Sequence, residues 1–408
     1  MQILGVVAFV LVMFDDPPMP VHEDPFGLPP LPADAAPDCG AQVAPAPGRA
    51  AQSNPTGRYE PVTRAAAHDG WDIEEALPPL RTQVSHERPR SVITYNRSPD
   101  LPFDRSINPY RGCEHGCIYC FARPTHAYLG LSPGLDFETR LIARPEAPQV
   151  LARELSARSY RCAPIAIGTN TDPYQPIEQT EGVMRACLEV LRAAKHPVAI
   201  VTKGTLIERD IDILSDMARE GLCRVGISVT TLDRHIARKM EPRVPPPARR
   251  LKVIKRLSEA GIPVRIMTSP VVPGLTDHEI EALLAAGKKA GADAASWIML
   301  RLPLEVAPLF EEWLAAAFPN RAARVMSHVR AMHGGATYRS DWHKRMRGEG
   351  PYADVIAGRF KLAARKLGLD APQPKLRCDL FVPPASAAAG KKKPPAQEAQ
   401  AARQLSLF

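Results

Sequence analysis

Short apolar segments alternate with amphipathic ones along the middle of the chain. The apolar runs are rich in β-branched residues and predict strands covered on both faces, at 164–168, 198–203, 223–230, 263–271 and 294–300. Helical spacing predicts helices between them, at 182–194, 207–220, 246–260 and 277–290. Three of these helices end on or beside a Gly, which is a signal for a helix C-terminus. A further short strand is predicted at 91–96.

Repeated strand–helix alternation predicts parallel strands joined by right-handed crossovers and covered by helices. We therefore predict an α/β fold, a partial or full α/β barrel. In such barrels the chemistry lies on the loops after the carboxyl ends of the strands. Residues 305–370 are mostly helical in pattern and are expected to pack on the barrel.

The two ends of the chain differ in composition from the middle. The 43 prolines are about twice the usual share of roughly 5%, and they crowd at the ends. Segments that are this rich in Pro and Ala and lack an apolar period cannot bury enough surface to fold. The predicted organisation is a disordered leader at 1–56, an N-terminal extension packing on the barrel at 57–104, the barrel at 105–304, a helical region at 305–382 and a flexible tail at 383–408.

Charge and cysteine content narrow the class of protein. A net charge of +8 suits a polyanionic partner such as nucleic acid, although such an excess also occurs on ordinary solvated surfaces. Eight cysteines are too sparse for a disulfide scaffold, and three lie within eight residues, which indicates metal chemistry in a reducing compartment. The apolar first 14 residues are too short to span a bilayer. We expect a soluble, cytoplasmic protein with no membrane contact.

The most informative stretch is NPYRGCEHGCIYCFARPTHAY, in which Cys113, Cys117 and Cys120 have the spacing Cys-x3-Cys-x2-Cys. Three thiolates on one short loop can each bind one iron of a [4Fe–4S] cluster and leave the fourth iron open. The alternative is a structural zinc site, for which His115 or His126 would supply the fourth ligand. The spacing favours the cluster, because zinc sites usually use two separated Cys-x2-Cys pairs and the chain has no second pair.

With this loop the chain resembles the radical SAM superfamily, whose motif also has an aromatic residue directly before the last Cys, here Tyr119. The resemblance covers about residues 100–300. It implies a partial (β/α)6 TIM-like barrel with the cysteine loop after its first strand. The stretches TNTDPYQPIE, VTKGTLIERD and MTSPVVPGLTD resemble the branch related to spore photoproduct lyase, a DNA repair enzyme.

The resemblance implies a reaction. The open iron of the [4Fe–4S] cluster would bind S-adenosyl-L-methionine, and an electron from a donor such as flavodoxin or ferredoxin would cleave it to a 5′-deoxyadenosyl radical. That radical would abstract hydrogen from a substrate, as in a lyase. The protein's part is to orient the cofactor and to exclude water.

The resemblance also implies cofactor contacts after the second strand. Tyr119 would lie near the adenine, and the loop Gly168, Thr169, Asn170 and Asp172 would bind the amino group of the cofactor. Polar and carboxylate groups on a strand's exit loop suit an ammonium ion. The alternative for Asp172 is an Asp-Pro turn.

Further candidates follow the later strands. Lys203 would meet the cofactor carboxylate or a substrate phosphate, although a single Lys at a strand end is usually solvated. Ser228 and Thr230 are predicted on one side of their strand, where the family contacts ribose and carboxylate; the alternative is hydrogen-bonded core. Arg301 is a weaker candidate for an anion contact.

The remaining cysteines are interpreted mainly as structural. Cys187 and Cys223 lie in apolar segments, whereas Cys162 and Cys378 could donate hydrogen if they were exposed at the site. The hydrogen-donating Cys of spore photoproduct lyase aligns with Thr169 of this chain. Repair of the same lesion by the same relay is therefore not expected.

The C-terminal residues Gln404, Leu405, Leu407 and Phe408 form the stretch QLSLF after a Lys/Pro/Ala-rich linker. This stretch resembles the pentapeptide with which bacterial replication and repair proteins bind the DNA polymerase III sliding clamp. A short apolar anchor on a disordered leash suits capture by a groove. The alternative is that these residues fold back on the barrel.

Three functions remain open from the sequence. The first is a radical SAM enzyme acting on nucleic acid, in DNA repair or modification. The second is radical SAM chemistry on a protein or a small molecule. The third is a non-catalytic, metal-stabilised scaffold that is recruited to the replication clamp through its tail.

Overall fold

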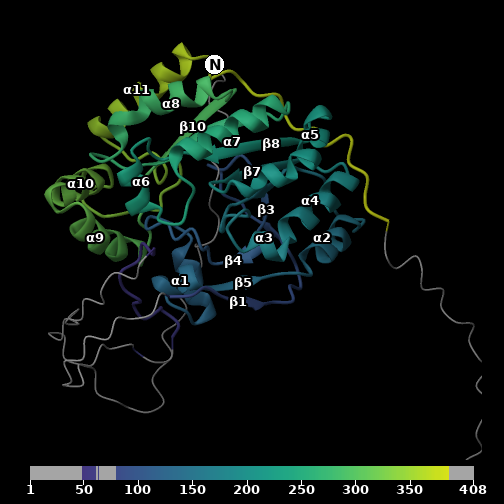
Figure 1. Ribbon diagram of the computed structural model, residues 1–408, viewed down its shortest axis with the longest axis horizontal. Helices are drawn as coiled ribbons and strands as arrows, with labels where there is room; N and C mark the ends of the chain where they lie inside the picture. The colour runs from purple at the N-terminus through teal and green to yellow at the C-terminus, as the bar shows by residue number, and fades with distance from the viewer. Residues whose placement is uncertain (1–47, 61–62, 64–79, 386–408) are drawn as a thin grey trace, which may run out of the picture.

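The structure is a computed structural model that describes residues 48–60, 63 and 80–385 (Figure 1). Most of the predicted leader, part of the N-terminal extension and the clamp-like residues Gln404 to Phe408 lie outside these described residues. In the described part, no helix is both long and apolar enough to cross a bilayer.

The described strands are β1 Gln83–His86, β2 Ile93–Tyr95, β3 Arg105–Ile107, β4 Tyr110–Arg111, β5 Arg140–Ala143, β6 Ile165–Ile167, β7 Val198–Thr202, β8 Cys223–Ser228, β9 Val264–Val271 and β10 Ala294–Met299. The described α-helices are α1 Leu135–Thr139, α2 Ala147–Leu155, α3 Glu178–Glu181, α4 Val183–Ala193, α5 Ile211–Arg219, α6 Arg234–Met240, α7 Pro247–Glu259, α8 Ile280–Lys289, α9 Val306–Ala317, α10 Pro319–Met332 and α11 Pro351–Lys366. Short 3₁₀ segments are η1 Arg123–Leu129, η2 Leu206–Asp210 and η3 Asp277–Glu279.

The main sheet has seven strands in the order β10-β9-β8-β7-β6-β3-β2. From β3 to β10 all neighbours pair in parallel, and β2 adds to β3 in the antiparallel direction. Since β2 and β10 are the two edges, the sheet curves into a partial barrel with an open side. The predicted α/β partial (β/α)6 barrel is confirmed.

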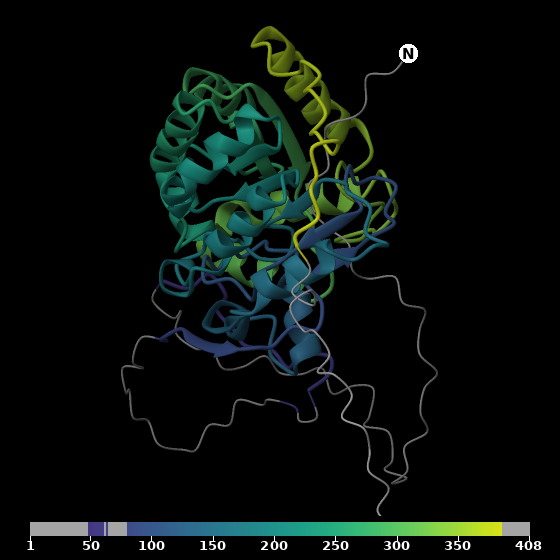
Figure 2. The same cartoon turned by 90° about the vertical axis from the view of Figure 1, so that its right-hand side faces the viewer.

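The helices form the outer layer of this barrel, as Figure 2 shows. α7 and α8 follow β8 and β9 and pack against them, while α5 follows β7 and packs against β8 and α4. The apolar sides of helix and strand meet closely at Gly287 of α8, where an added Cβ would lie 2.5 Å from Cδ1 of Ile266 in β9. The predicted strands and helices of this region are confirmed to within four residues at each end.

A second, three-stranded sheet was not predicted. Its order is β1-β5-β4, and together with α1 it lies beside the start of the cysteine loop (Figure 1). All four residues of β1 are exposed and β4 has only two residues, so neither carries an apolar pattern, and the apolar part of β5 is limited to three residues. The first barrel strand, β3, was missed because its residues, RSI, include only one apolar side chain.

The helical region after the barrel closes the cysteine-loop side. Apolar residues of α9 and α10, including Phe310, Trp313 and Val325, form one buried cluster with Ile118 and Tyr119 of the cysteine loop. α11 packs beside α8 (Figure 1).

The predicted helical region extends to residue 382, but residues 371–382 are not helical. They form a strap that runs down the side of the barrel (Figure 2). Its backbone bonds to the turns before β7 and β8, through Val382 N to Ala194 O at 2.9 Å and Arg377 N to Gly221 O at 3.1 Å. The backbone is thus satisfied without a helix.

The predicted boundary of the disordered leader at residue 56 also needs correction. The backbone N–H groups of Ala50 and Ala51 donate to the carboxylate of Glu138, and both alanines are buried. The side chain of Asn54 donates to Asp136 at 3.0 Å. These partners in α1 hold residues 48–56 in place. They are more than 80 residues away in the sequence, so no local sequence pattern could predict them.

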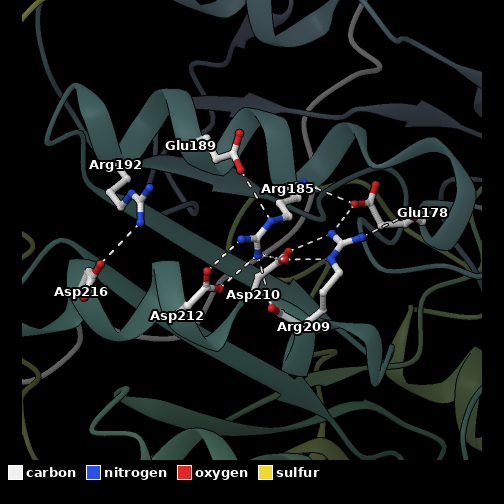
Figure 3. A network of polar contacts seen from close by, with 8 residues as sticks. All are labelled: Glu178, Arg185, Glu189, Arg192, Arg209, Asp210, Asp212 and Asp216. Carbon is white, nitrogen blue, oxygen red and sulfur yellow. Dashed lines mark hydrogen bonds and ion pairs between the residues drawn. The ribbon is translucent and has the colours of Figure 1, made fainter.

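An ion-pair network fastens the segments that follow β6 and β7 (Figure 3). Arg209 binds Glu178 at 2.5 Å and Asp210 at 2.8 Å, while Arg185 binds Asp210 at 2.9 Å. The carboxylates of Glu178 and Asp210 are fully buried, so their pairing offsets a large desolvation cost. Glu178 also accepts a hydrogen bond from Tyr110, directly before the cysteine loop. Three outer pairs extend the network: Arg185–Asp212, Arg185–Glu189 and Arg192–Asp216.

The close contact between α8 and β9 leads to a prediction about stability. Replacing the fully buried Ile266 by Ala (Ile266→Ala) removes packing next to Gly287 and should lower the free energy of unfolding by about 2–5 kcal/mol. Val355→Ala on α11 is the matched control, because that side chain is 56% exposed and its loss should change stability little. Denaturant unfolding of both variants measures the difference; equal midpoints would contradict the packing described.

Candidate active site

The cysteine loop makes two turns that only glycine allows. Gly112 and Gly116 have φ of 73° and 62°, in the left-handed region. A Cβ at Gly112 would lie 2.8 Å from Cδ2 of Leu141, and one at Gly116 would lie 2.5 Å from Oε2 of Glu138. The loop therefore follows the surface of α1 and β5 too closely for any side chain at these two positions.

A buried arginine holds the middle of this loop. Arg123 is fully buried and donates to the carbonyl oxygens of Gly116 and Cys117, both at 3.1 Å. Its guanidinium pairs with Glu138 at 2.5 Å, and Glu138 has no exposed side-chain area either. The same guanidinium also donates to the carbonyls of Pro133 and Gly134. One side chain thus satisfies several loop carbonyls that would otherwise be buried without partners.

The start of the loop is fixed by the segment after β6. Nε2 of the buried Gln175 donates to Gly112 O at 3.2 Å, and its Oε1 accepts from Glu114 N at 2.8 Å. Thr171 donates to the same carbonyl at 2.7 Å. The loops that follow β3 and β6 are therefore bonded to one another on both sides of Cys113.

A cavity lies where these loops meet, at the carboxyl ends of the barrel strands. It has a cavity volume of about 130 Å³ and is partly open to solvent. Its lining comes from the loops after β3, β6 and β7 and from residues at or near the ends of β8, β9 and β10. This is the edge at which α/β barrels carry their chemistry.

The structure brings most of the predicted site residues to this cavity. Those that line it are Cys113, Cys117, Tyr119, Cys120, Gly168, Thr169, Asn170, Asp172, Lys203, Ser228 and Arg301. Thr230 does not line it; its hydroxyl donates to Glu241 at 3.0 Å. Thr230 lies beyond the end of β8, so the predicted alternation along the strand no longer holds there.

Asp172 lines the cavity, but its oxygens already have partners in the protein. Oδ1 accepts from Thr202 at 2.5 Å and from Tyr174 N at 2.9 Å, and Oδ2 accepts from Lys203 N at 2.8 Å. Nδ1 of His115 lies 3.2 Å from Oδ2. Burial by itself would raise the pKa of Asp172, but His115 and the hydrogen bonds outweigh it and lower the pKa to about 2. The ionised Asp172 thus links the loop after β6 to the loop after β7 and to the cysteine loop.

Behind Tyr119 lies a second buried carboxylate, Glu241. It accepts from the hydroxyl of Tyr119 and pairs with Arg250 at 2.7 Å. Burial would raise the pKa of Glu241, but the charges of Arg250 and Lys203 outweigh it, so the pKa is lowered. The ammonium of Lys203 lies 5.6 Å from the centre of the Tyr119 ring. This arrangement fixes the tyrosine ring and holds a cation at the cavity wall.

Arg301 brings a second cation to the wall. Its guanidinium lies 5.2 Å from the ring centre of Phe121 and 5.8 Å from that of Tyr338. Burial is the main reason that the pKa of Arg301 is lowered. A buried Arg remains charged despite this lowering. The cavity wall therefore has two positive charges, one from Lys203 after β7 and one from Arg301 after β10.

The three thiols face a common cavity without converging on one point. In the described part of the chain, no group of three or more His, Cys, Asp or Glu side chains is arranged to hold a single metal ion. His126, a candidate fourth zinc ligand, does not line the cavity and is hydrogen-bonded to Arg140 O at 2.9 Å. Burial raises the pKa of the three thiols, that of Cys117 to about 12. The three thiols therefore line one cavity, as does His115, the other candidate zinc ligand.

Cys162 and Cys378 do not line the cavity. Cys162 precedes β6, at the opposite end of the strand from the cysteine loop, and Cys378 lies in the strap. The pKa of Cys162 is raised to about 12, first by burial and then by its neighbour Cys378. The two thiols are therefore close to each other, but the structure does not bring either of them to the predicted hydrogen-donor position.

Comparison with known families agrees with this geometry. Residues 107–286 match the model of the Radical SAM superfamily, a range that begins at the end of β3 and includes the cysteine loop. The chain carries a radical SAM domain. The superfamily implies S-adenosylmethionine and an iron–sulfur cluster as cofactors.

Relatives of this radical SAM protein include uncharacterized proteins. Those from Mycobacterium tuberculosis and Mycobacterium bovis are 38% identical over 226 residues, which is 55% of this chain and 66% of theirs. One from Methanocaldococcus jannaschii is 25% identical over 174 residues, 42% of this chain and 62% of that protein. The chain thus spans just under two thirds of the length of these relatives.

Among solved structures, the radical SAM protein is similar to spore photoproduct lyase. For the structure complexed with dinucleoside spore photoproduct, the identity is 14%, the TM-score is 0.49, and the match covers 70% of this chain and 79% of that one. For a mutant with bound AdoMet and the same dinucleoside, the identity is 15% and the TM-score is 0.44, with 70% and 77% covered.

Several residues that support this site were not predicted from the sequence. They are Asn108, Arg123, Glu138, Gln175, Glu241 and Arg250. Each is a polar residue that a single sequence would assign to the surface or to a turn. Only the pairing across distant segments reveals their role.

The buried pair Arg123–Glu138 leads to a prediction for the site. Arg123→Met leaves Glu138 as an unpaired buried charge and releases the carbonyls of Gly116 and Cys117, so it should cost about 3–5 kcal/mol and reduce the iron bound per chain. Arg330→Met is the control, because the ion pair between Arg330 and Glu311 is largely exposed. Its loss should lower the free energy of unfolding by about 1 kcal/mol or less. Denaturant unfolding and iron analysis after anaerobic reconstitution measure both effects. Full iron binding by Arg123→Met would show that this pair does not support the loop.

Proposed function

We propose that this protein is a radical SAM enzyme that binds a [4Fe–4S] cluster through Cys113, Cys117 and Cys120 and acts on nucleic acid, in a lyase-like repair or modification reaction. The observation that carries the proposal is the single cavity that these three thiols share with the strand-end residues of a radical SAM domain. Such a cluster, once bound, supplies an electron for reductive cleavage of S-adenosylmethionine.

The chain's own residues would bind and orient the cofactor. Lys203 and Arg301 are cations at the cavity wall, suited to the cofactor's carboxylate or to a substrate phosphate. Asn170 and Ser228 provide polar groups at the ends of β6 and β8. Tyr119, held by Glu241, and Phe121 give the cavity aromatic walls that limit the access of water.

Nucleic acid as the substrate is supported by the net charge of +8 and by the sequence stretches that resemble the spore photoproduct lyase branch. The lesion is not proposed to be the same, because Thr169 stands where that enzyme's branch has its hydrogen donor. The electron would come from a separate reductant such as flavodoxin or ferredoxin, in the cytoplasm.

The test is the release of 5′-deoxyadenosine by the anaerobically reconstituted full chain with dithionite. We expect release from S-adenosylmethionine, an increase of several-fold on adding ultraviolet-damaged DNA, and loss of release in Cys117→Ala. Release that is unaffected by DNA would favour a protein or small-molecule substrate. No release, together with stoichiometric zinc in the purified protein, would favour the non-catalytic scaffold and reject the proposal.

We also propose that the stretch Gln404 to Phe408 binds the bacterial DNA polymerase III sliding clamp. The pattern of Gln, Leu and Leu-Phe supports this proposal, together with the Lys/Pro/Ala-rich linker before it.

Replacing Leu407 and Phe408 by Ala should weaken clamp binding at least tenfold, since each substitution removes an apolar anchor. Surface plasmon resonance compares the variant with the full chain and with Gln397→Ala, in the linker, as the control. Equal affinities would reject clamp binding without affecting the enzymatic proposal.

A further inference from the structure

The open side of the barrel is covered by one loop, which we call the seam loop (residues 338–347). Its buried end joins the two edges of the main sheet. Met346 O accepts from Met299 N of β10 at 2.9 Å, and the Met346 side chain packs with Ile298 and with Leu101 of the β2–β3 connection. Arg345 pairs with Asp100 of the same connection at 2.7 Å, and both side chains are nearly buried.

The seam loop also contacts a residue of the cavity wall. The ring of Tyr338, at its first residue, lies 5.8 Å from the guanidinium of Arg301, which lines the cavity wall. Arg301 follows Met299, the last residue of β10, whose N–H donates to Met346 O. A molecule bound on the outer face of the seam loop would thus lie at the margin of the site.

The outer part of this loop exposes a tryptophan. Trp342 is 50% exposed, whereas the other two described tryptophans, Trp297 and Trp313, are 4% and 3% exposed. The next residue, His343, has a φ of 67°, an uncommon conformation for a residue with a side chain, and its N–H donates to Asp100 at 3.2 Å. The backbone beside Trp342 is therefore held by Asp100 of the β2–β3 connection.

The residues next to this tryptophan in the sequence are rich in positive charge. The ten residues of the seam loop include four Lys or Arg and one Asp. Arg339 and Lys344 are about half exposed and pair with the exposed carboxylates of Asp341 and Glu349. Exposed pairs of this kind contribute about 1 kcal/mol or less, so these two cations can exchange their carboxylates for phosphates.

We propose that the seam loop is a single-stranded nucleic-acid contact of this enzyme, in which an unpaired base stacks on Trp342 and Arg339 and Lys344 bind the neighbouring phosphates. An exposed aromatic ring within a cationic surface is the arrangement that binds unpaired nucleotides with little dependence on sequence. Duplex DNA fits less well, because its bases are already stacked. The inference rests on the proposed action on nucleic acid. It specifies the place on the protein at which the strand binds.

The test is binding of a fluorescein-labelled ten-nucleotide single-stranded DNA to the reconstituted full chain, followed by anisotropy at low salt. Trp342→Ala should raise Kd about tenfold, and Trp342→Phe should restore most of the affinity because a ring remains. Tyr95→Ala is the matched control, since Tyr95 is 58% exposed and lies beside Arg105 at the amino end of β3; its Kd should equal that of the unaltered chain. Thermal unfolding of each variant confirms that it folds.

A second measurement checks the phosphate contacts. Replacing Arg339 and Lys344 together by Gln should reduce the slope of log Kd against log salt concentration by about 1.4, from about 0.7 for each lost phosphate contact on a single strand. Suppose that the unaltered chain binds the DNA and that the Trp342→Ala and double-Gln variants have the same Kd and salt dependence. The seam-loop inference is then overturned and the proposed function stands. If the unaltered chain binds no DNA at all, both are overturned.

Discussion

The radical SAM site depends first on a buried ion pair, Arg123 with Glu138. A loop that must present three thiols to a cavity cannot also form a helix or a strand, so its carbonyls need other partners. Arg123 supplies them for Gly116 and Cys117, and Glu138 supplies the charge that makes a buried guanidinium tolerable. The same carboxylate binds the backbone at Ala50 and Ala51, so a segment that lies early in the chain becomes part of the support for the loop.

The barrel adds a second constraint, because parallel strands end at one edge and bring their exit loops together. These loops are bonded to one another through side chains. Asn108 after β3 accepts from Asn170 N after β6 at 3.0 Å, and Asp172 joins the loop after β6 to Thr202 and Lys203 of β7 and its exit. The cavity wall is therefore rigid where polar groups face it, as binding in a fixed orientation requires.

The sequence predicted those parts of this arrangement that have a local pattern. Strands β6 to β10 are buried on both faces, so their apolar runs are visible, and the spacing of Cys113, Cys117 and Cys120 is visible in the same way. β3 was missed because its residues, RSI, include only one apolar side chain. Thr230 was placed by extending the alternation of β8 beyond its end. Contacts between distant segments, such as Gln175 with Gly112, leave no trace in a single sequence.

Elements from both halves of the chain are needed to enclose the cysteine loop. Tyr119 packs with α9 and α10, and Trp313 of α9 donates to Lys239 O at 3.1 Å, at the end of α6. Because burial raises the pKa of the three thiols, their environment favours the protonated form until positive charge approaches. Arg123 and Lys203 supply part of such charge. The complete fold therefore shields the thiols from water and leaves their ionisation dependent on nearby positive charge.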